Sequence, residues 1–185
     1  MCRRNFLRKN GTADHRCRMI CDNHGNLPQD LSMTQLDGTD RAILNALQEN
    51  GRLTNAELAA GVNLSPSACL RRVRLLEESG LIARTVALLD PRLAGVPGTA
   101  YVSVTLDSQG RKALDTFEQA VRHVPEITEC YLLAGQHDYL LRVVYHDSRD
   151  LERIHTEILT PLPGVVRVQS TLTLRTVKRT TKLPI

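Results

Sequence analysis

Apolar residues repeat with two different periods along the chain, and the change of period divides it into two parts. Between residues 36 and 82 they recur every three or four positions, so that Ile43, Leu44 and Leu47 share one face of a predicted helix. From residue 99 onward, short β-rich runs alternate with amphipathic helical stretches. The pattern predicts a helical unit followed by an α+β unit.

Residues 54–80 are predicted to form two short helices joined by a tight turn. Thr54 followed by Glu57 is a capping box, in which each side chain satisfies a free backbone N–H group of the first turn. Ser65 and Pro66 start the second helix, since serine caps well and proline suits the first helical position. Gly80 ends it. Only residues 61–64 separate the helices, which is the spacing of a helix-turn-helix.

The second of these helices carries the candidate DNA contacts on its exposed side. An exposed cationic helix fits the major groove of DNA, because arginine pairs with phosphate or, bidentately, with guanine. We expect Ser67, Ala68 and Arg71 to read bases, and Arg72 and Arg74 to hold phosphates or brace the helix. The alternative is an ordinary solvated face. The full candidate set is Ser65, Ser67, Ala68, Arg71, Arg72 and Arg74.

A connecting segment follows the helical unit. Residues 81–89 are apolar, partly β-branched and too short for a stable helix, so a strand is predicted. Asp90 and Pro91 break it, and Gly95, Pro97 and Gly98 indicate a hinge. We therefore assign residues 36–82 to the helix-turn-helix domain and residues 83–98 to a linker strand and hinge.

Residues 99–185 are predicted to form a second domain with a ferredoxin-like βαββαβ antiparallel sheet. Each predicted helix has a single apolar stripe that would cover one face of the sheet. The predicted order is strand 100–106, helix 108–124, strands 127–134 and 138–146, helix 148–159 and strand 165–177. Such sheets serve ligand binding and oligomerisation in many proteins, so the function must be argued from a local site.

The local candidate is the turn between the second and third strands. Gly135 permits close backbone approach to a ligand, and Asp138 supplies a carboxylate that could meet an α-ammonium group. The alternative is that Asp138 only holds the hairpin turn. The predicted effector contacts are Ala134, Gly135, Gln136, His137, Asp138 and Tyr139. No residue pattern supports catalysis, and His155 has no identifiable partner in the sequence.

Composition fits two small domains. The chain has 185 residues, 42% of them hydrophobic, which suffices for two cores. Its net charge is +4, yet residues 37–90 hold six basic against seven acidic residues, so the cationic character of the helical unit must come from the clustered arginines. Five cysteines without a secretory signal favour a reducing cytoplasm, and no apolar run is long enough for a membrane span.

Residues 1–35 lack apolar periodicity and are interpreted as a disordered or misassigned N-terminal extension, with Met33 as an alternative initiator. His15, Cys17, Cys21 and His24 could gather zinc in principle. Their spacing matches no zinc module, so no metal and no cofactor is predicted.

Two separated runs, residues 36–82 and 129–143, resemble the Lrp/AsnC family of prokaryotic transcription regulators. The family usually has glycine where Asn63 stands here, and asparagine tolerates the same left-handed backbone. The resemblance implies a non-enzymatic regulator that binds double-stranded DNA and an amino-acid effector such as leucine. It also implies homodimers, paired partly through the linker strand, that assemble into octamers with the effector turn between neighbouring dimers, and a cytoplasmic, nucleoid-associated location. The alternative is an architectural DNA-wrapping protein without a functional effector site.

Overall fold

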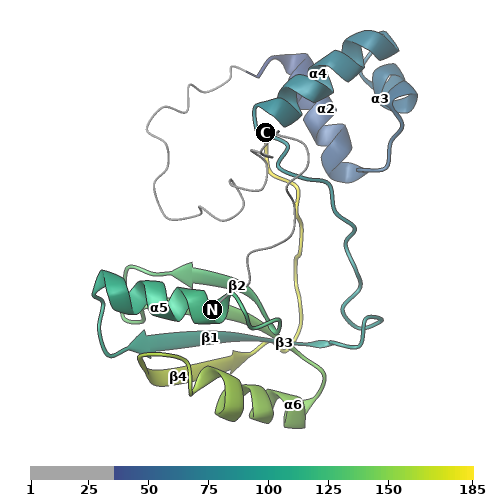
Figure 1. The fold of residues 1–185 in the computed structure, drawn as a ribbon. Coiled ribbons are helices and arrows are strands. Elements are labelled where there is room, and N and C mark those ends of the chain that lie inside the picture. Colours follow the sequence, from purple (N-terminus) through teal and green to yellow (C-terminus); the bar gives the residue numbers. More distant parts are fainter. Residues whose placement is uncertain (1–35) are drawn as a thin grey trace, which may run out of the picture.

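The computed structural model describes residues 36–185, which form a helical head and a separate sheet domain (Figure 1). The head comprises residues 36–82 and the sheet domain residues 98–172. The linker, residues 83–97, and the tail, residues 173–185, both run between them. None of the helices in this range is long and apolar enough to cross a membrane. The predicted N-terminal extension, with its histidines and cysteines, lies outside the described residues.

The head has the three helices that the sequence predicts. They are α2 (Gly38–Glu49), α3 (Asn55–Gly61) and α4 (Pro66–Glu78). The Asp37 side chain caps α2 by accepting a hydrogen bond from the Asp40 N–H. The helices pack around a small core in which Ile43 and Cys69 are fully buried. The other buried members are Leu44, Leu58, Ala59 and Leu76.

The linker differs from its prediction. Residues 83–90 have no strand assignment and are exposed, whereas the sequence predicts a strand there. A strand exists only when its backbone groups pair with a neighbouring strand, and this segment pairs with no other segment within the described part of this chain. Val86, Leu88 and Leu89 are therefore left more than half exposed.

The predicted hinge is a hydrogen-bonded turn. The Asp90 carboxylate accepts from the backbone N–H groups of Arg92 and Leu93, and the Val96 N–H donates to the Pro91 carbonyl. Gly95 has a φ of 84°, a left-handed conformation that suits glycine. Gly98 instead begins the first strand. The linker is thus bent at a defined position.

The sheet domain has the ferredoxin-like topology predicted from sequence. Its strands are β1 (Gly98–Leu106), β2 (Ile127–Leu132), β3 (Tyr139–Tyr145) and β4 (Val165–Leu172). They are arranged in the order β2-β3-β1-β4, and all neighbours are antiparallel. β2 and β4 end two and five residues earlier than predicted, at Leu132 against residue 134 and at Leu172 against residue 177. The predicted order of elements is confirmed.

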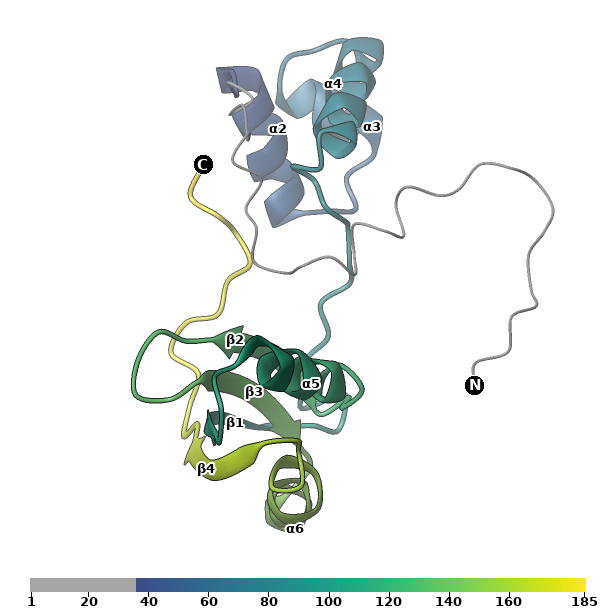
Figure 2. The same ribbon diagram turned by 60° about the vertical axis from the view of Figure 1, so that its left-hand side comes forward.

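The helices of this domain cover one face of the sheet (Figure 2). They are α5 (Arg111–Val121) and α6 (Ser148–Arg153), and α6 continues into a π-helical turn, η1 (Ile154–Leu159). Phe117 of α5 and Ile154 of η1 are fully buried against Val102 of β1 and Leu141 of β3. The opposite face carries the alternate strand residues, is not covered by any helix of the described chain, and is the open face of the sheet.

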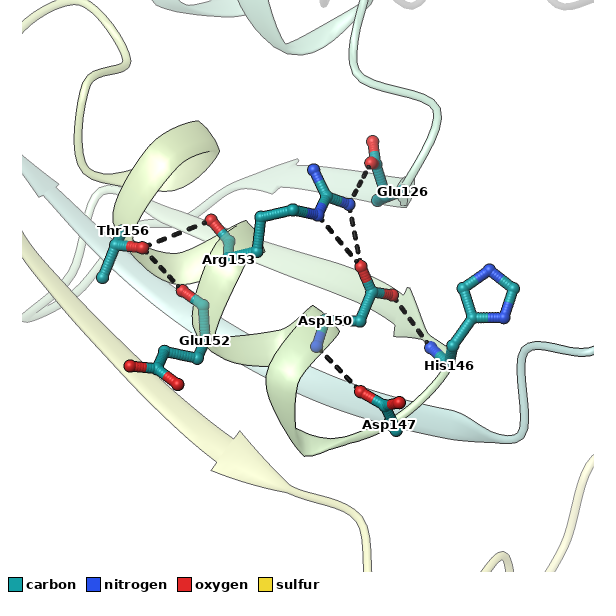
Figure 3. Close-up of polar contacts among 7 residues, drawn as sticks. All are labelled: Glu126, His146, Asp147, Asp150, Glu152, Arg153 and Thr156. Carbon is teal, nitrogen blue, oxygen red and sulfur yellow. Dashed lines mark hydrogen bonds and ion pairs between the residues drawn. The ribbon is translucent and has the colours of Figure 1, made fainter.

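A polar network fastens α6 to the ends of two strands (Figure 3). Arg153 donates to Glu126 at 3.0 Å and to Asp150 at 2.8 Å, while the His146 backbone N–H donates to Asp150 at 2.9 Å. The His146 N–H and then the Arg153 guanidinium hold the pKa of Asp150 below its usual value. The network fixes the start of α6 next to the turn at Gly95, whose backbone lies beside the His146 ring.

Candidate DNA-binding and effector sites

The turn before α4 has the geometry that a helix-turn-helix needs. The capping box at Thr54 and Glu57 is present in full, and the Ser65 hydroxyl accepts from the Ala68 N–H. Asn63 has a φ of 55°, so it adopts the left-handed conformation expected where the family has glycine. Gly80, with a φ of 78°, follows the end of α4 as predicted. These local signals set where α4 begins and ends.

Arg72 braces the head. One guanidinium nitrogen, Nη1, lies 2.7 Å from both Asp37 Oδ2 and Asp40 Oδ1, which joins α4 to the start of α2. The Asp40 N–H and then Arg72 lower the pKa of Asp37. Arg72 thus forms ion pairs with two carboxylates of the head, an arrangement compatible with the bracing role, one of the two roles that the sequence left open for it.

Arg71 and Arg74 have no ion-pair partner among residues 36–185, and both are exposed. Ser67 is exposed one turn earlier on the same helix, and Ala68 is half-buried. Arg71 also borders a hollow of about 220 Å³, whose other lining residues are Asp40 of α2 together with Arg72, Leu75, Leu76 and Ser79. The exposed face of α4 therefore combines two unneutralised guanidinium groups with small polar side chains, which is compatible with a nucleic-acid contact.

Asn55 has a role that sequence reasoning missed. Its side-chain amide donates to the Pro66 carbonyl at 2.8 Å and so ties the start of α3 to the first turn of α4. This bond links the two helices directly, next to the apolar contacts of the core. Its position at the start of α3 was visible in the sequence, but its partner depends on how the helices cross.

The candidate effector turn closes the β2–β3 hairpin. The Leu133 N–H donates to the Asp138 carbonyl at 2.8 Å. Ala134, Gly135 and Gln136 are exposed at its tip. A side chain at Gly135 would meet open space, so the single chain does not require glycine there. His137 is half-buried, and its Nδ1 lies 3.4 Å from the Thr105 hydroxyl.

Asp138 points inward. Its Oδ2 accepts from the buried Leu106 N–H at 2.7 Å and its Oδ1 accepts from the Gln109 amide at 2.8 Å, with only 6% of the residue exposed. The carboxylate thus links the turn to the end of β1 and the loop after it. This is the alternative that the sequence left open, in which the aspartate holds the turn.

Tyr139 also faces the core. Its ring lies 4.5 Å from that of Phe117, centroid to centroid, and its hydroxyl donates to Glu118 at 2.9 Å. Cys130 lies on the neighbouring strand, where burial, and then the charge of Glu118, raises the pKa of its thiol to about 11. Of the six predicted effector residues, the structure therefore leaves the three at the tip exposed and turns the last two inward.

No group of three or more histidine, cysteine or acidic side chains within residues 36–185 could hold a metal ion. His155, for which the sequence offered no partner, lies 3.2 Å from the Ser170 hydroxyl through Nδ1, within the fold.

Comparison with known proteins agrees with this architecture. Residues 36–83 match the family model of the winged helix-turn-helix DNA-binding domain, and residues 99–183 match that of the Lrp/AsnC ligand binding domain. The chain is 44% identical to the proline dehydrogenase transcriptional activator of Rhodobacter capsulatus over 139 residues, 75% of this chain and 90% of that protein.

Two further relatives match over longer stretches. The leucine-responsive regulatory protein of Escherichia coli is 39% identical over 150 residues, 81% of this chain and 92% of its own. A transcriptional regulator of Neisseria meningitidis, solved in complex with L-methionine, superposes with a TM-score of 0.77 at 40% identity and covers 80% of this chain and 96% of its own. From its sequence, its two domains and these relatives, the chain belongs to the Lrp/AsnC family of transcriptional regulators.

Proposed function

We propose that this regulator binds double-stranded DNA through the exposed face of α4 and that an amino acid bound at the sheet domain changes this binding. The observation that supports DNA binding is a difference in contacts among the arginines of α4. Arg72 is neutralised by Asp37 and Asp40, whereas Arg71 and Arg74 remain exposed and unpaired within the described chain. Cationic side chains without internal partners are free to meet phosphates and base edges.

Alanine variants test whether Arg71 and Arg74 contact DNA. We expect Arg71→Ala to weaken specific binding about 5- to 150-fold if the side chain contacts a base, with relaxed specificity at that position. If Arg74 contacts a phosphate, Arg74→Ala weakens binding to all sequences and flattens the dependence of affinity on salt. Lys112→Ala, on an exposed position of α5, is the control. Parental affinity in both α4 variants, each still folded, would contradict the assignment.

For the effector, the exposed tip formed by Ala134, Gly135 and Gln136 is the proposed contact surface, with His137 at its edge. Asp138 and Tyr139 would then act by holding the turn, since both are buried and hydrogen-bonded inside the domain. The Neisseria relative was solved with L-methionine, which supports an amino acid such as methionine or leucine as the effector here. Thermal-shift measurements with all twenty amino acids test whether the chain binds an amino acid and which one.

We further infer a homodimer that assembles into an octamer. Support comes from apolar surface that the single chain leaves uncovered: Tyr101 on the open face of the sheet is 42% exposed, and Leu88 and Leu93 in the linker are 67% and 90% exposed. Exposed apolar surface of this kind can be covered by a second copy of the chain, and large exposed apolar patches often mark protein–protein interaction sites. Sedimentation with and without effector tests the assembly. The setting we propose is the cytoplasm, with the protein on the nucleoid.

One observation favours a second candidate. The carboxylate of Asp138 is occupied inside the fold, so the charge that the sequence suggested for an α-ammonium is not displayed at the turn of this chain. An architectural DNA-wrapping protein without an effector response would bind DNA equally well with and without amino acids. The effector measurements above separate the two.

A further inference from the structure

The head and the sheet domain are joined at a second place besides the linker. Within the described residues, every hydrogen bond or ion pair between the head and residues 83–185 involves tail residues 182–185. The tail leaves the end of β4 and runs toward the head, as both ribbon views show (Figures 1 and 2), and there it contacts α2.

The contacts lie on one exposed side of α2. The Gln48 side chain forms two hydrogen bonds with the backbone of Leu183. Its Nε2 donates to the Leu183 carbonyl at 3.3 Å, and its Oε1 accepts from the Leu183 N–H at 2.6 Å. This pair satisfies the backbone of Leu183 in the way that a neighbouring β-strand would. One turn earlier, the Asn45 amide donates to the Ile185 carbonyl at 3.3 Å.

A charged pair adds to these bonds. The Lys182 ammonium group forms an ion pair with Glu49, the last residue of α2, and it lowers the pKa of Glu49 through that contact. A cation at this position is also favoured because the carboxyl end of a helix carries partial negative charge. Residues 173–185 contain four cationic and no acidic side chains, so the tail has the charge that suits this end of α2.

We propose that residues 182–185 form an intramolecular strap that docks on Asn45, Gln48 and Glu49 of α2 and restricts the orientation of the head relative to the sheet domain. The strap holds the head at one point while the linker holds it at another. Two attachments leave a DNA-reading head fewer orientations than one, so docking pre-organises it.

The docking is weak enough to be reversible. All four contacts are exposed to solvent. Exposed ion pairs and exposed hydrogen bonds of side-chain amides each stabilise only slightly, because water competes for the same groups. A weakly docked strap is easily shifted by any event that favours either its docked or its released arrangement. Rearrangement of the sheet domain is such an event, because β4 leads directly into the tail.

Limited trypsin cleavage after Arg179 of the full chain measures docking, since a protease needs the tail released. Two comparisons each keep the tail sequence constant. Glu49→Lys should be cleaved about two- to tenfold faster than the parent, because an attraction becomes a repulsion. Lys182→Glu combined with Glu49→Lys should be cleaved more slowly than Lys182→Glu alone, because the pair is restored with its signs exchanged.

Glu152→Lys on α6 is the matched control, because its side chain is exposed and has no partner within the described chain. It should be cleaved like the parent. Equal cleavage of Glu49→Lys and the parent would overturn the proposal, as would a double variant no better protected than Lys182→Glu alone. These outcomes do not depend on DNA, so they are separate from a failure of the proposed function.

Coassembly of the two single variants tests whether the strap docks on its own subunit. In a mixed dimer, docking within a subunit places two cations against each other in the Glu49→Lys chain and two carboxylates against each other in the Lys182→Glu chain, so both tails stay released. Docking on the partner would bring opposite charges together and restore protection. Protection of the mixture beyond that of each variant alone would overturn an intramolecular strap.

Discussion

Replacement of Asp138 by alanine should destabilise the sheet domain. The change removes the acceptor for the Leu106 N–H, whose hydrogen bond is buried, and the partner of the Gln109 amide. A hydrogen bond to a charged group contributes about 1.5–3 kcal/mol, and a buried donor left without a partner costs a similar amount. We therefore expect Asp138→Ala to lower the free energy of unfolding by about 2–3 kcal/mol.

Asparagine at the same position should be tolerated better. Its carbonyl oxygen can still accept from the Leu106 N–H, and the Gln109 amide can rotate to accept from the new NH₂ group. Only the charge is lost, so a decrease of about 1 kcal/mol is expected. If Asp138 acts by holding the turn, the free energy of unfolding should fall from the parent to Asp138→Asn and further to Asp138→Ala. If its charge is itself required, the asparagine variant should be as unstable as the alanine variant.

Urea denaturation followed by tyrosine fluorescence measures these effects on the sheet domain alone. The chain has no tryptophan, and its four tyrosines all lie between residues 101 and 145. Gln136→Ala, at the exposed tip of the same turn, is the control and should unfold like the parent. Asp138→Ala within about 0.5 kcal/mol of the parent, with an unchanged m value, would refute the role assigned to the carboxylate.

Three further predictions follow from single contacts. Arg72→Ala should lower the melting temperature of the head, measured by helical circular dichroism, because Asp37 and Asp40 lose their shared partner; an unchanged transition would contradict the brace. Cys130, whose thiol pKa is raised to about 11, should react with iodoacetamide far more slowly at pH 8 than in the unfolded chain. Asp150→Asn should be less stable than the parent above about pH 4, and the gap should close as pH falls below that value, because a carboxylate with a lowered pKa stabilises the fold only while ionised.

The sequence allowed the head to be predicted almost completely, because its determinants are local. Capping by Thr54 and Ser65, the left-handed Asn63 and the terminal Gly80 each act within a few residues. The order of strands and helices in the sheet domain was likewise predictable from its alternating pattern, although strand ends were not. A strand ends where its backbone pairing with the neighbouring strand stops, and that position depends on the register between distant segments.

The orientation of side chains at the two sites could not be predicted in the same way. Whether Arg72 faces DNA or Asp40 depends on how α2 crosses α4, and whether Asp138 faces solvent depends on the loop after β1. The strand predicted for residues 81–89 fails for a related reason. Its apolar, β-branched composition suits a strand, but a strand requires a partner that the described part of the chain does not provide.

The response of DNA binding to amino acids separates an effector-responsive regulator from an architectural protein. A duplex selected from random double-stranded DNA by the full chain can be titrated by fluorescence anisotropy at fixed salt, with and without leucine, methionine and each other amino acid. We expect at least one of them to change the affinity about fivefold or more, together with a change in sedimentation. Identical affinity and assembly with all twenty amino acids would contradict an effector-responsive regulator and favour an architectural DNA-binding protein.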